Sequence, residues 1–365
     1  MILTVIIFVA VLAVIILVHE FGHFLTARFF GVTVEEFGIG FPPRAKGFKT
    51  KKTLYSINWI PAGGFVKLKG EQGDHKGEED SFSNQKIWKR AIILFAGVSM
   101  NVVLAVVIFS FAYIIGMPKA VETDLGAYAR VSNRYVQVVD VYENTPAAEA
   151  KLLPGDILLS INGETPTSTD DIKNITQSHL NEPLTITYER DDKNFTTEAT
   201  PKLLKETPDR PTIGIATVAV GDVSYPFFVA IWMGVKETGH YLWMIISSLW
   251  GMLANLVSHQ PVNGDLVGPI GVAVITGKFV ALGFIYLLQF VALISLNLAI
   301  VNVLPIPALD GGRILFLVLE KLKGGPVNQR TEAIIHNVGF IVILLLIGFI
   351  TIRDIFQIDK INSLF

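Results

Sequence analysis

Long runs of apolar residues dominate the pattern along this chain. Four of them reach the roughly 20 residues that a helix needs to cross the hydrocarbon core of a bilayer. They lie at about residues 2–29, 91–115, 281–304 and 334–352. We therefore predict a polytopic α-helical membrane protein with about four transmembrane helices.

A further apolar segment, residues 241–257, only just reaches the length of a span. Charged and titratable residues precede it, and aromatic residues of the kind found at bilayer interfaces lie within it and shortly before it. These aromatic residues are Trp232, Tyr241, Trp243 and Trp250. For these reasons we interpret residues 226–258 as one helix on the membrane surface. If residues 241–257 instead crossed the membrane, the orientation of every later segment would be inverted.

Basic residues fix the predicted orientation. Eleven Lys and Arg residues lie between the first two predicted spans. By the positive-inside rule this loop faces the cytoplasm, which places the N-terminus and residues 116–280 outside. The chain as a whole carries a formal net charge of −2, so no strong positive field indicates a nucleic-acid partner.

The long outer segment contains a predicted soluble, β-rich domain at residues 128–206. Short runs rich in β-branched and aromatic residues alternate there with turn signals such as Pro154-Gly155-Asp156 and Asn162-Gly163. The predicted organisation is transmembrane residues 1–115 with a hairpin at about 55–70, a linker at 116–127, the β-rich domain at 128–206, an interfacial helical segment at 207–280 and transmembrane residues 281–365.

The first predicted span contains the sequence HEFGH, from His19 to His23. Residues four apart share one helix face, so both imidazoles can bind one metal ion. Glu20 lies beside them, placed to take a proton from a water molecule, which is the metalloprotease pattern. Titratable side chains are costly within hydrocarbon, which favours a functional interpretation.

A catalytic zinc ion requires a third protein ligand. The chain has no cysteine, so a thiolate is excluded. The segment NVLPIPALDGGR, residues 302–313, ends the third predicted span, since Pro305 and Pro307 interrupt a helix. The predicted topology places Asp310 at the same membrane boundary as the two histidines. From the residues alone, an ordinary Asp-Gly turn in a loop is an equally open interpretation.

HEFGH in the first span and NVLPIPALDGG after the third resemble the site-2 protease family of intramembrane zinc metalloproteases. This resemblance implies that His19, His23 and Asp310 hold one zinc ion and that Glu20 is the catalytic base. It also implies that Asn302 contacts the substrate backbone. The segment PAGGFVKLKG, residues 61–70, resembles the family's membrane-associated β-hairpin, in which Gly63, Gly64 and Phe65 would bind substrate.

Two further features are consistent with the same family. The pair Gly97 and Asn101 matches a GxxxN pattern in the second span, although small-residue helix packing explains it equally well. The run ENTPAAEAKLLPGDILLSINGE resembles the core of a bacterial PDZ domain, and a single such insertion is similar to the regulator of sigma-E protease type. Lys151 stands where that family usually has Gly, so it must adopt a left-handed backbone or reshape the turn.

The expected function is cleavage of peptide bonds within or near the spans of single-span membrane proteins. The resemblance implies substrates such as anti-sigma factors or remnant signal peptides, a location in the bacterial inner membrane and an active site toward the cytoplasmic side. We expect a monomer embedded in the lipid bilayer. The PDZ-like domain would either recruit trimmed substrates or exclude bulky ones.

Two other classes of protein stay open as alternatives. A zinc transporter or sensor would spread polar residues over several helices, often in repeated halves, and no repeat is visible. A non-catalytic PDZ scaffold with a structural zinc would need a fourth ligand. The remaining histidines are expected to have surface or packing roles: His75, His179, His240, His259 and His336.

Overall fold

The computed structural model divides the chain into two compact units. One comprises residues 1–110 and 231–364, and the other comprises residues 111–230. The structure describes residues 2–71, 75, 77–121, 125–126, 128–190, 193–204, 207–260, 267–325 and 327–357.

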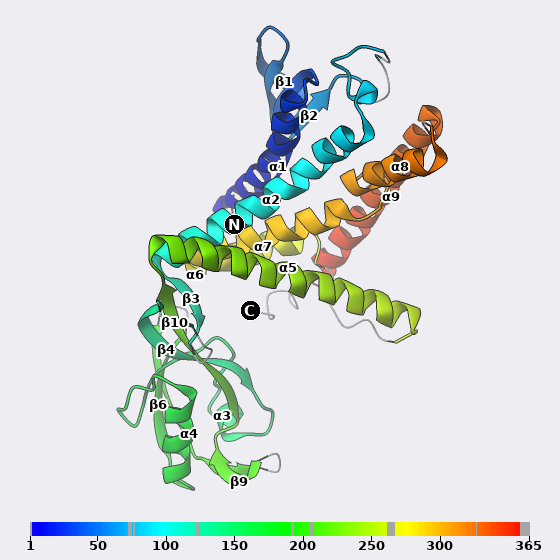
Figure 1. Cartoon of the computed structure of the whole chain (residues 1–365). Helices are drawn as coiled ribbons and strands as arrows, with labels where there is room; N and C mark the ends of the chain where they lie inside the picture. Colours follow the sequence, from blue (N-terminus) through cyan, green and yellow to red (C-terminus); the bar gives the residue numbers. More distant parts are fainter. Residues whose placement is uncertain are drawn as a thin grey trace. The chain divides into compact units, whose positions relative to one another are not determined.

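Helices make up most of the first unit (Figure 1). They are α1 (Ile2–Phe29), α2 (Ile87–Ile115), α5 (Phe227–Val257), α6 (Pro269–Leu282), α7 (Phe284–Val303), α8 (Asp310–Lys323) and α9 (Gln329–Phe356). The four predicted spans coincide with α1, α2, α7 and α9, which confirms them as long apolar helices. Among the described residues, α5 is a fifth helix with the length and composition of a span, and its mean hydropathy is the lowest of the five.

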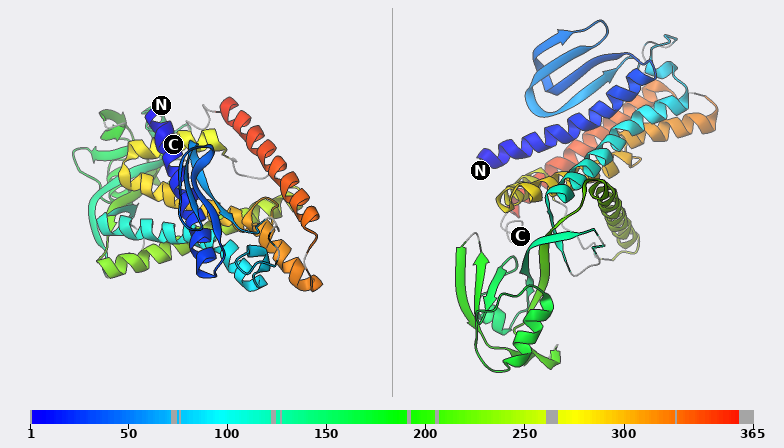
Figure 2. Two further views of the ribbon diagram at one scale, coloured as in Figure 1. Left: turned by 90° about the horizontal axis from the view of Figure 1, so that it is seen from above. Right: turned by 60° about the vertical axis from the view of Figure 1, so that its left-hand side comes forward.

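Helices α1 and α2 pack side by side, as both figures show (Figures 1 and 2). A Cβ atom at Gly22 would lie 2.7 Å from the carbonyl carbon of Ala96, so only glycine allows this approach. Small residues bring helix backbones together in this way within membranes. Near the start of α2, Arg90 donates two hydrogen bonds to Glu320 of α8, at 3.0 and 3.2 Å.

The loop between α1 and α2 folds into a sheet of two long, bent antiparallel strands, β1 (Val34–Lys49) and β2 (Leu54–Leu68). The first part of β1 pairs on both sides, since Phe37 lies opposite both Tyr55 and Val66. The last part of β2 therefore forms an edge of the sheet within the described chain. The predicted hairpin at 55–70 covered only β2, because β1 lacks regular alternation of apolar and polar residues.

The second unit is built on a six-stranded antiparallel sheet in the order β3-β10-β4-β5-β6-β7. Its strands are β3 (Met117–Ala120), β4 (Arg130–Val141), β5 (Ile157–Ile161), β6 (Leu184–Arg190), β7 (Lys193–Ala199) and β10 (Ile215–Ser224). Strands β8 (Lys202–Leu204) and β9 (Thr207–Thr212) form a separate pair. The short helices of this unit are α3 (Pro146–Glu149) and α4 (Thr169–Ser178). The first unit has one short 3-10 turn among its described residues, Phe82–Asn84. Fully buried side chains such as Val136, Leu158 and Ile186 form the core of the second unit.

The boundaries predicted for the β-rich domain require correction at both ends. Strand β3 lies inside the predicted linker 116–127, and β10 lies inside the segment 207–280 that was predicted to be helical. Both strands belong to the main sheet, where β10 pairs with β3 on one side and β4 on the other. A four-residue strand directly after an apolar helix carries too little pattern to be recognised from sequence.

Lys151 adopts the left-handed backbone expected of it, with φ at +59°. Its carbonyl oxygen accepts a hydrogen bond from the Arg190 guanidinium at 2.9 Å, and the same guanidinium donates two bonds of 2.6 Å to Asp156. The turn after α3 is therefore fixed by neighbouring groups, although a left-handed conformation costs a residue with a Cβ atom about 1–2 kcal/mol.

Replacing this lysine tests that strain. Lys151→Gly should raise the stability of the second unit by about 1 kcal/mol, because glycine adopts the left-handed region freely. Hydrogen exchange of residues 146–161 in the full chain would measure it as slower exchange. Lys151→Ala keeps the Cβ atom and should bring no gain. Equal protection in both variants would show that the lysine backbone is unstrained.

Candidate metal-binding active site

Two buried histidines project from one face of α1. His19 and His23 are each only 6% exposed, although both are titratable. Their spacing of one helical turn brings the two Nε2 atoms to 3.1 Å from each other. The rings meet edge to face, with centroids 4.8 Å apart.

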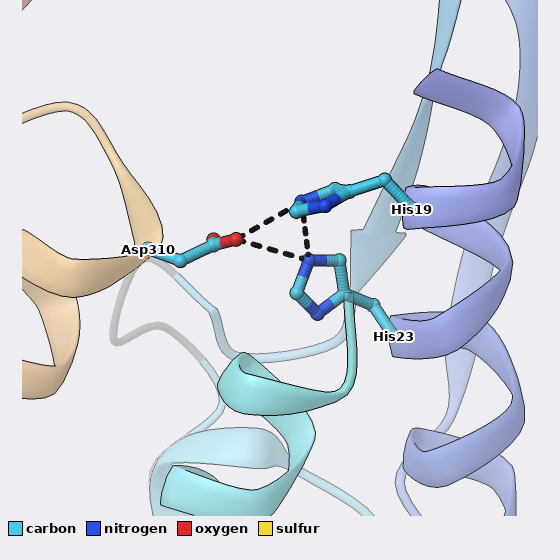
Figure 3. Close-up of side chains that lie close together, drawn as sticks. All are labelled: His19, His23 and Asp310. Carbon is cyan, nitrogen blue, oxygen red and sulfur yellow. Dashed lines mark hydrogen bonds and ion pairs between the residues drawn. The ribbon is translucent and has the colours of Figure 1, made fainter. Parts of the chain in front are cut away.

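Asp310 completes the cluster from the far end of the sequence (Figure 3). It is the first residue of α8, and its Oδ2 atom lies 3.0 Å from His19 Nε2 and 3.3 Å from His23 Nε2. The chain reaches this position because α7 ends at Val303 and two prolines follow. Gly312 then lets α8 begin close to the loop, since a Cβ there would lie 2.9 Å from the Ile306 carbonyl carbon.

The donor atoms of this cluster suit a zinc ion. His23 Nδ1 lies 2.8 Å from the Ile93 carbonyl oxygen, which can only accept, so Nδ1 carries the proton. In the neutral form that binds a metal, the Nε2 lone pair would then face His19 and Asp310. In a tetrahedral site with bonds of about 2.0–2.2 Å, donor atoms are separated by about 3.3 Å, close to the observed 3.0–3.3 Å. An outer hydrogen bond that fixes a histidine tautomer is typical of metal ligands.

Gly97 of α2 lies directly against the cluster. A Cβ atom there would lie 2.7 Å from His23 Cε1 and 2.8 Å from His19 Cε1, closer than any side chain tolerates. Asn101, one turn further, is fully buried, and its backbone carbonyl accepts a hydrogen bond from Ser295 at 2.9 Å. The sequence pattern GxxxN therefore marks a helix approach that leaves room for the two imidazoles, and not helix packing alone.

Glu20 links the cluster to the edge of the hairpin sheet. Its Oε2 atom accepts a hydrogen bond of 3.0 Å from the backbone N–H of Val66, near the end of β2. This N–H faces away from β1, because the edge of the sheet is open there. The carboxylate is thus held within the site by a group that a strand added to this edge would also contact.

A cavity of about 210 Å³ opens beside the cluster. Its lining residues are Ile16, His19, Glu20, Leu298, Asn302, Ala308, Leu309 and Asp310. The structure therefore brings Asn302 together with Glu20, His19 and Asp310. Gly63 and Gly64 do not line this cavity but pack on α1, where Cβ atoms would lie 2.9 Å from Ile16 and 2.7 Å from Leu17.

Phe65 takes a different position from its neighbours. Its ring lies over Gly38 of β1, within the sheet, and it does not line the cavity. The edge strand as a whole nevertheless contacts α1 beside the site. Gly63, with φ at +114°, allows the chain to turn into this edge.

An ion pair joins the end of the edge strand to the helix that carries Asp310. Arg313 of α8 pairs with Glu71, and Glu71 also accepts a hydrogen bond from the Leu68 N–H at 3.3 Å. Burial opposes the charge of Arg313, but the adjacent carboxylate more than offsets this and raises the pKa of the guanidinium. The Arg313 guanidinium thus stays charged, and its contact with Glu71 ties β2 to α8.

The sequence could not reveal two groups that hold the site. The Val66 N–H and the Ile93 carbonyl are backbone groups, which every position carries, so no residue pattern identifies them. Only their location opposite Glu20 and His23 gives them a role. Glu71 could have been sought as an acidic partner for Arg313, but nothing in the spacing connects residues so distant.

Comparison with known proteins agrees with this geometry. The family model described as Peptidase family M50 matches residues 7–346. A Brucella suis protein with a zinc-metalloprotease name is 32% identical to this chain. The match covers 97% of this chain and 95% of the Brucella protein. The regulator of sigma-W protease RasP of Bacillus subtilis is 29% identical, over 96% of this chain and 98% of its own.

One solved structure is similar to part of the chain. The PDZ domain of an SdrC-like protein from Listeria monocytogenes shares 27% identity and covers 24% of this chain and 92% of its own, with a TM-score of 0.22. The PDZ-like assignment of the second unit stays a prediction from its sequence pattern.

The close contact at Gly97 generates a direct test. Gly97→Ala should weaken metal binding at least tenfold and abolish activity, because the new methyl group displaces the imidazoles. Metal content after dialysis against a chelator would measure the loss. Gly348→Ala in α9 is the matched control, since a Cβ there meets nothing within 4 Å. Normal metal retention in Gly97→Ala would contradict the assigned site.

Proposed function

The chain belongs to peptidase family M50 and is an intramembrane zinc metalloprotease, and we propose that its catalytic zinc ion, one per chain, is held by His19, His23 and Asp310. The convergence of three donor atoms within 3.3 Å at a buried point carries this proposal. Family membership favours hydrolysis over the zinc transporter and PDZ scaffold alternatives.

Glu20 is the general base in this proposal. Zinc supplies Lewis acidity, which lowers the pKa of a water molecule and polarises the scissile carbonyl. Glu20 takes the proton from the attacking water and afterwards delivers it to the leaving amine. The Val66 N–H holds the carboxylate in place for both transfers. Asn302, across the cavity, offers a donor and an acceptor to the substrate backbone.

Access to the scissile bond requires the substrate helix to unwind. Within hydrocarbon, the freed backbone groups need new hydrogen-bond partners, because each unpaired group costs several kcal/mol. The outer edge of β2 from Gly63 to Leu68 lies beside the site and offers backbone groups other than the Val66 and Leu68 N–H, which already bond Glu20 and Glu71. We infer that the unwound substrate adds to this edge as a strand, with the glycines allowing it to lie close to α1.

The substrates in this proposal are single-span membrane proteins. RasP of Bacillus subtilis is named as a regulator of sigma-W protease, which supports anti-sigma factors as one class. Remnant signal peptides have the same chemistry, since each is one short apolar helix without an outer domain. A monomer in the bacterial cytoplasmic membrane suffices for this reaction.

The proposed orientation places the active site toward the cytoplasm and residues 111–230 outside. The basic loop between α1 and α2 supports this by the positive-inside rule. The proposed orientation also requires α5 to lie on the membrane surface. Trp232, Trp243 and Trp250 are 11 and 7 residues apart, which puts them on one face of α5, and their exposures of 66%, 70% and 73% suit an interface.

The role of Glu20 is tested by one substitution. Glu20→Gln should retain one zinc ion per chain but lose at least about 100-fold in kcat, because the amide cannot accept the proton. Cleavage of a tagged single-span substrate without its outer domain, in detergent, gives the rate. Asp310→Asn should instead lose zinc. If Glu20→Gln loses zinc to the same extent as Asp310→Asn, Glu20 is not the base but part of the metal site.

The orientation is tested by labelling, which the absence of cysteine makes simple. Single cysteines at the exposed positions Ser178, Ser258 and Thr50 report on three segments. In spheroplasts, an impermeant maleimide should label Ser178→Cys and Ser258→Cys, and should label Thr50→Cys only after lysis. Labelling of Ser258→Cys only after lysis would mean that α5 crosses the membrane.

A further inference from the structure

His336 contacts the loop that carries Asp310, although the sequence suggested only a surface or packing role. It lies on α9, and its Nδ1 atom accepts a hydrogen bond of 2.9 Å from the backbone N–H of Ala308. Ala308 lines the cavity and precedes Asp310 by two residues. The ring also lies against Phe316 of α8, with centroids 5.4 Å apart.

Ala308 needs such a contact because its backbone is unusual. Its φ of +78° lies in the left-handed region, which costs a residue with a Cβ atom about 1–2 kcal/mol. The loop's own backbone hydrogen bonds run from the Ile306 N–H to Leu304 and from the Leu309 N–H to Ile306, and neither uses the Ala308 N–H. Pro305 and Pro307 have no N–H to donate. An outside acceptor for the Ala308 N–H therefore stabilises a conformation that the loop alone would leave.

A second contact from the same helix face fixes the adjacent residue. Gly339 is three positions after His336, so both face the loop. A Cβ atom at Gly339 would lie 2.5 Å from Pro307 Cβ and 2.9 Å from its carbonyl oxygen. Helix α9 thus holds Pro307 by close packing and Ala308 by a hydrogen bond, directly before the proposed ligand.

We propose that His336 is a positioning residue for the metal site: its hydrogen bond holds Ala308 in the left-handed conformation from which Asp310 reaches His19 and His23. This rests on the proposed role of Asp310 as a ligand. The chemistry favours a bonding role over packing. The neutral ring that accepts at Nδ1 carries its proton on Nε2, which is buried without a hydrogen-bond partner among the described residues. An apolar side chain would pack there without that cost.

Two substitutions separate the hydrogen bond from packing. His336→Leu keeps an apolar body but has no acceptor, whereas the Oδ1 of His336→Asn can occupy the position of Nδ1. We expect His336→Leu to weaken zinc binding about 10–100-fold, measured by competition with a chelator on the full chain in detergent. We expect kcat to fall while KM changes less than about twofold, and His336→Asn to restore both zinc affinity and kcat to within about threefold of wild type.

The controls distinguish this proposal from the proposed function. His179→Leu, in α4's C-terminal cap and outside the first unit, should leave zinc affinity unchanged. If Asp310→Asn loses zinc while His336→Leu binds it normally, the ligand assignment stands and the role of His336 is overturned. Equal losses in the Leu and Asn variants also overturn it, because the acceptor would then be irrelevant. Zinc retention by Asp310→Asn would instead refute the proposed ligand set.

Discussion

The structure depends on one constraint: two imidazoles and a carboxylate must meet at a buried point of a helix built for hydrocarbon. Polar groups there are costly unless each has a partner, and they find partners in one another. Several otherwise unrelated features follow from this requirement. Gly97 leaves space for the two rings, and the Ile93 carbonyl fixes the tautomer of His23. The prolines after Val303 end α7, so that the chain can turn and place Asp310 beside the histidines.

In the proposed function, the outer edge of β2 connects this cluster to substrate. The same strand that packs on α1 through its glycines also donates the Val66 N–H to Glu20. A substrate strand on this edge would therefore lie within reach of the base without any further element. Glu71 and Arg313 extend the connection to α8, so the strand, Glu20 and the helix that carries Asp310 belong to one bonded arrangement.

The sequence predicted the parts of this arrangement that depend on local spacing. Residues four apart in HEFGH must share a helix face, and apolar runs of sufficient length gave α1, α2, α7 and α9. For Lys151 the surrounding pattern left two alternatives, a left-handed backbone or a reshaped turn, and the structure has the first. Asp310 was different: its distance from His19 along the chain is so large that the residues alone left a simple turn equally open, and resemblance to a family decided it.

The remaining features lie beyond such patterns for physical reasons. The Val66 N–H and the Ile93 carbonyl are backbone groups without a residue signature. Strand β3 is too short, and β1 too irregular, to show the period of a strand. The role of His336 depends on the conformation of Ala308, which an alanine in the sequence gives no reason to expect.

X-ray absorption at the zinc edge of the purified wild-type protein tests the central claim most directly. The account predicts one zinc ion per chain, bound by two imidazole nitrogens at about 2.0–2.1 Å and by oxygen at about 2.0–2.2 Å. In Asp310→Ala the bound zinc should disappear or lose an oxygen neighbour. A spectrum with fewer than two imidazoles, or one unchanged by Asp310→Ala, would contradict the assignment of His19, His23 and Asp310 as the metal site.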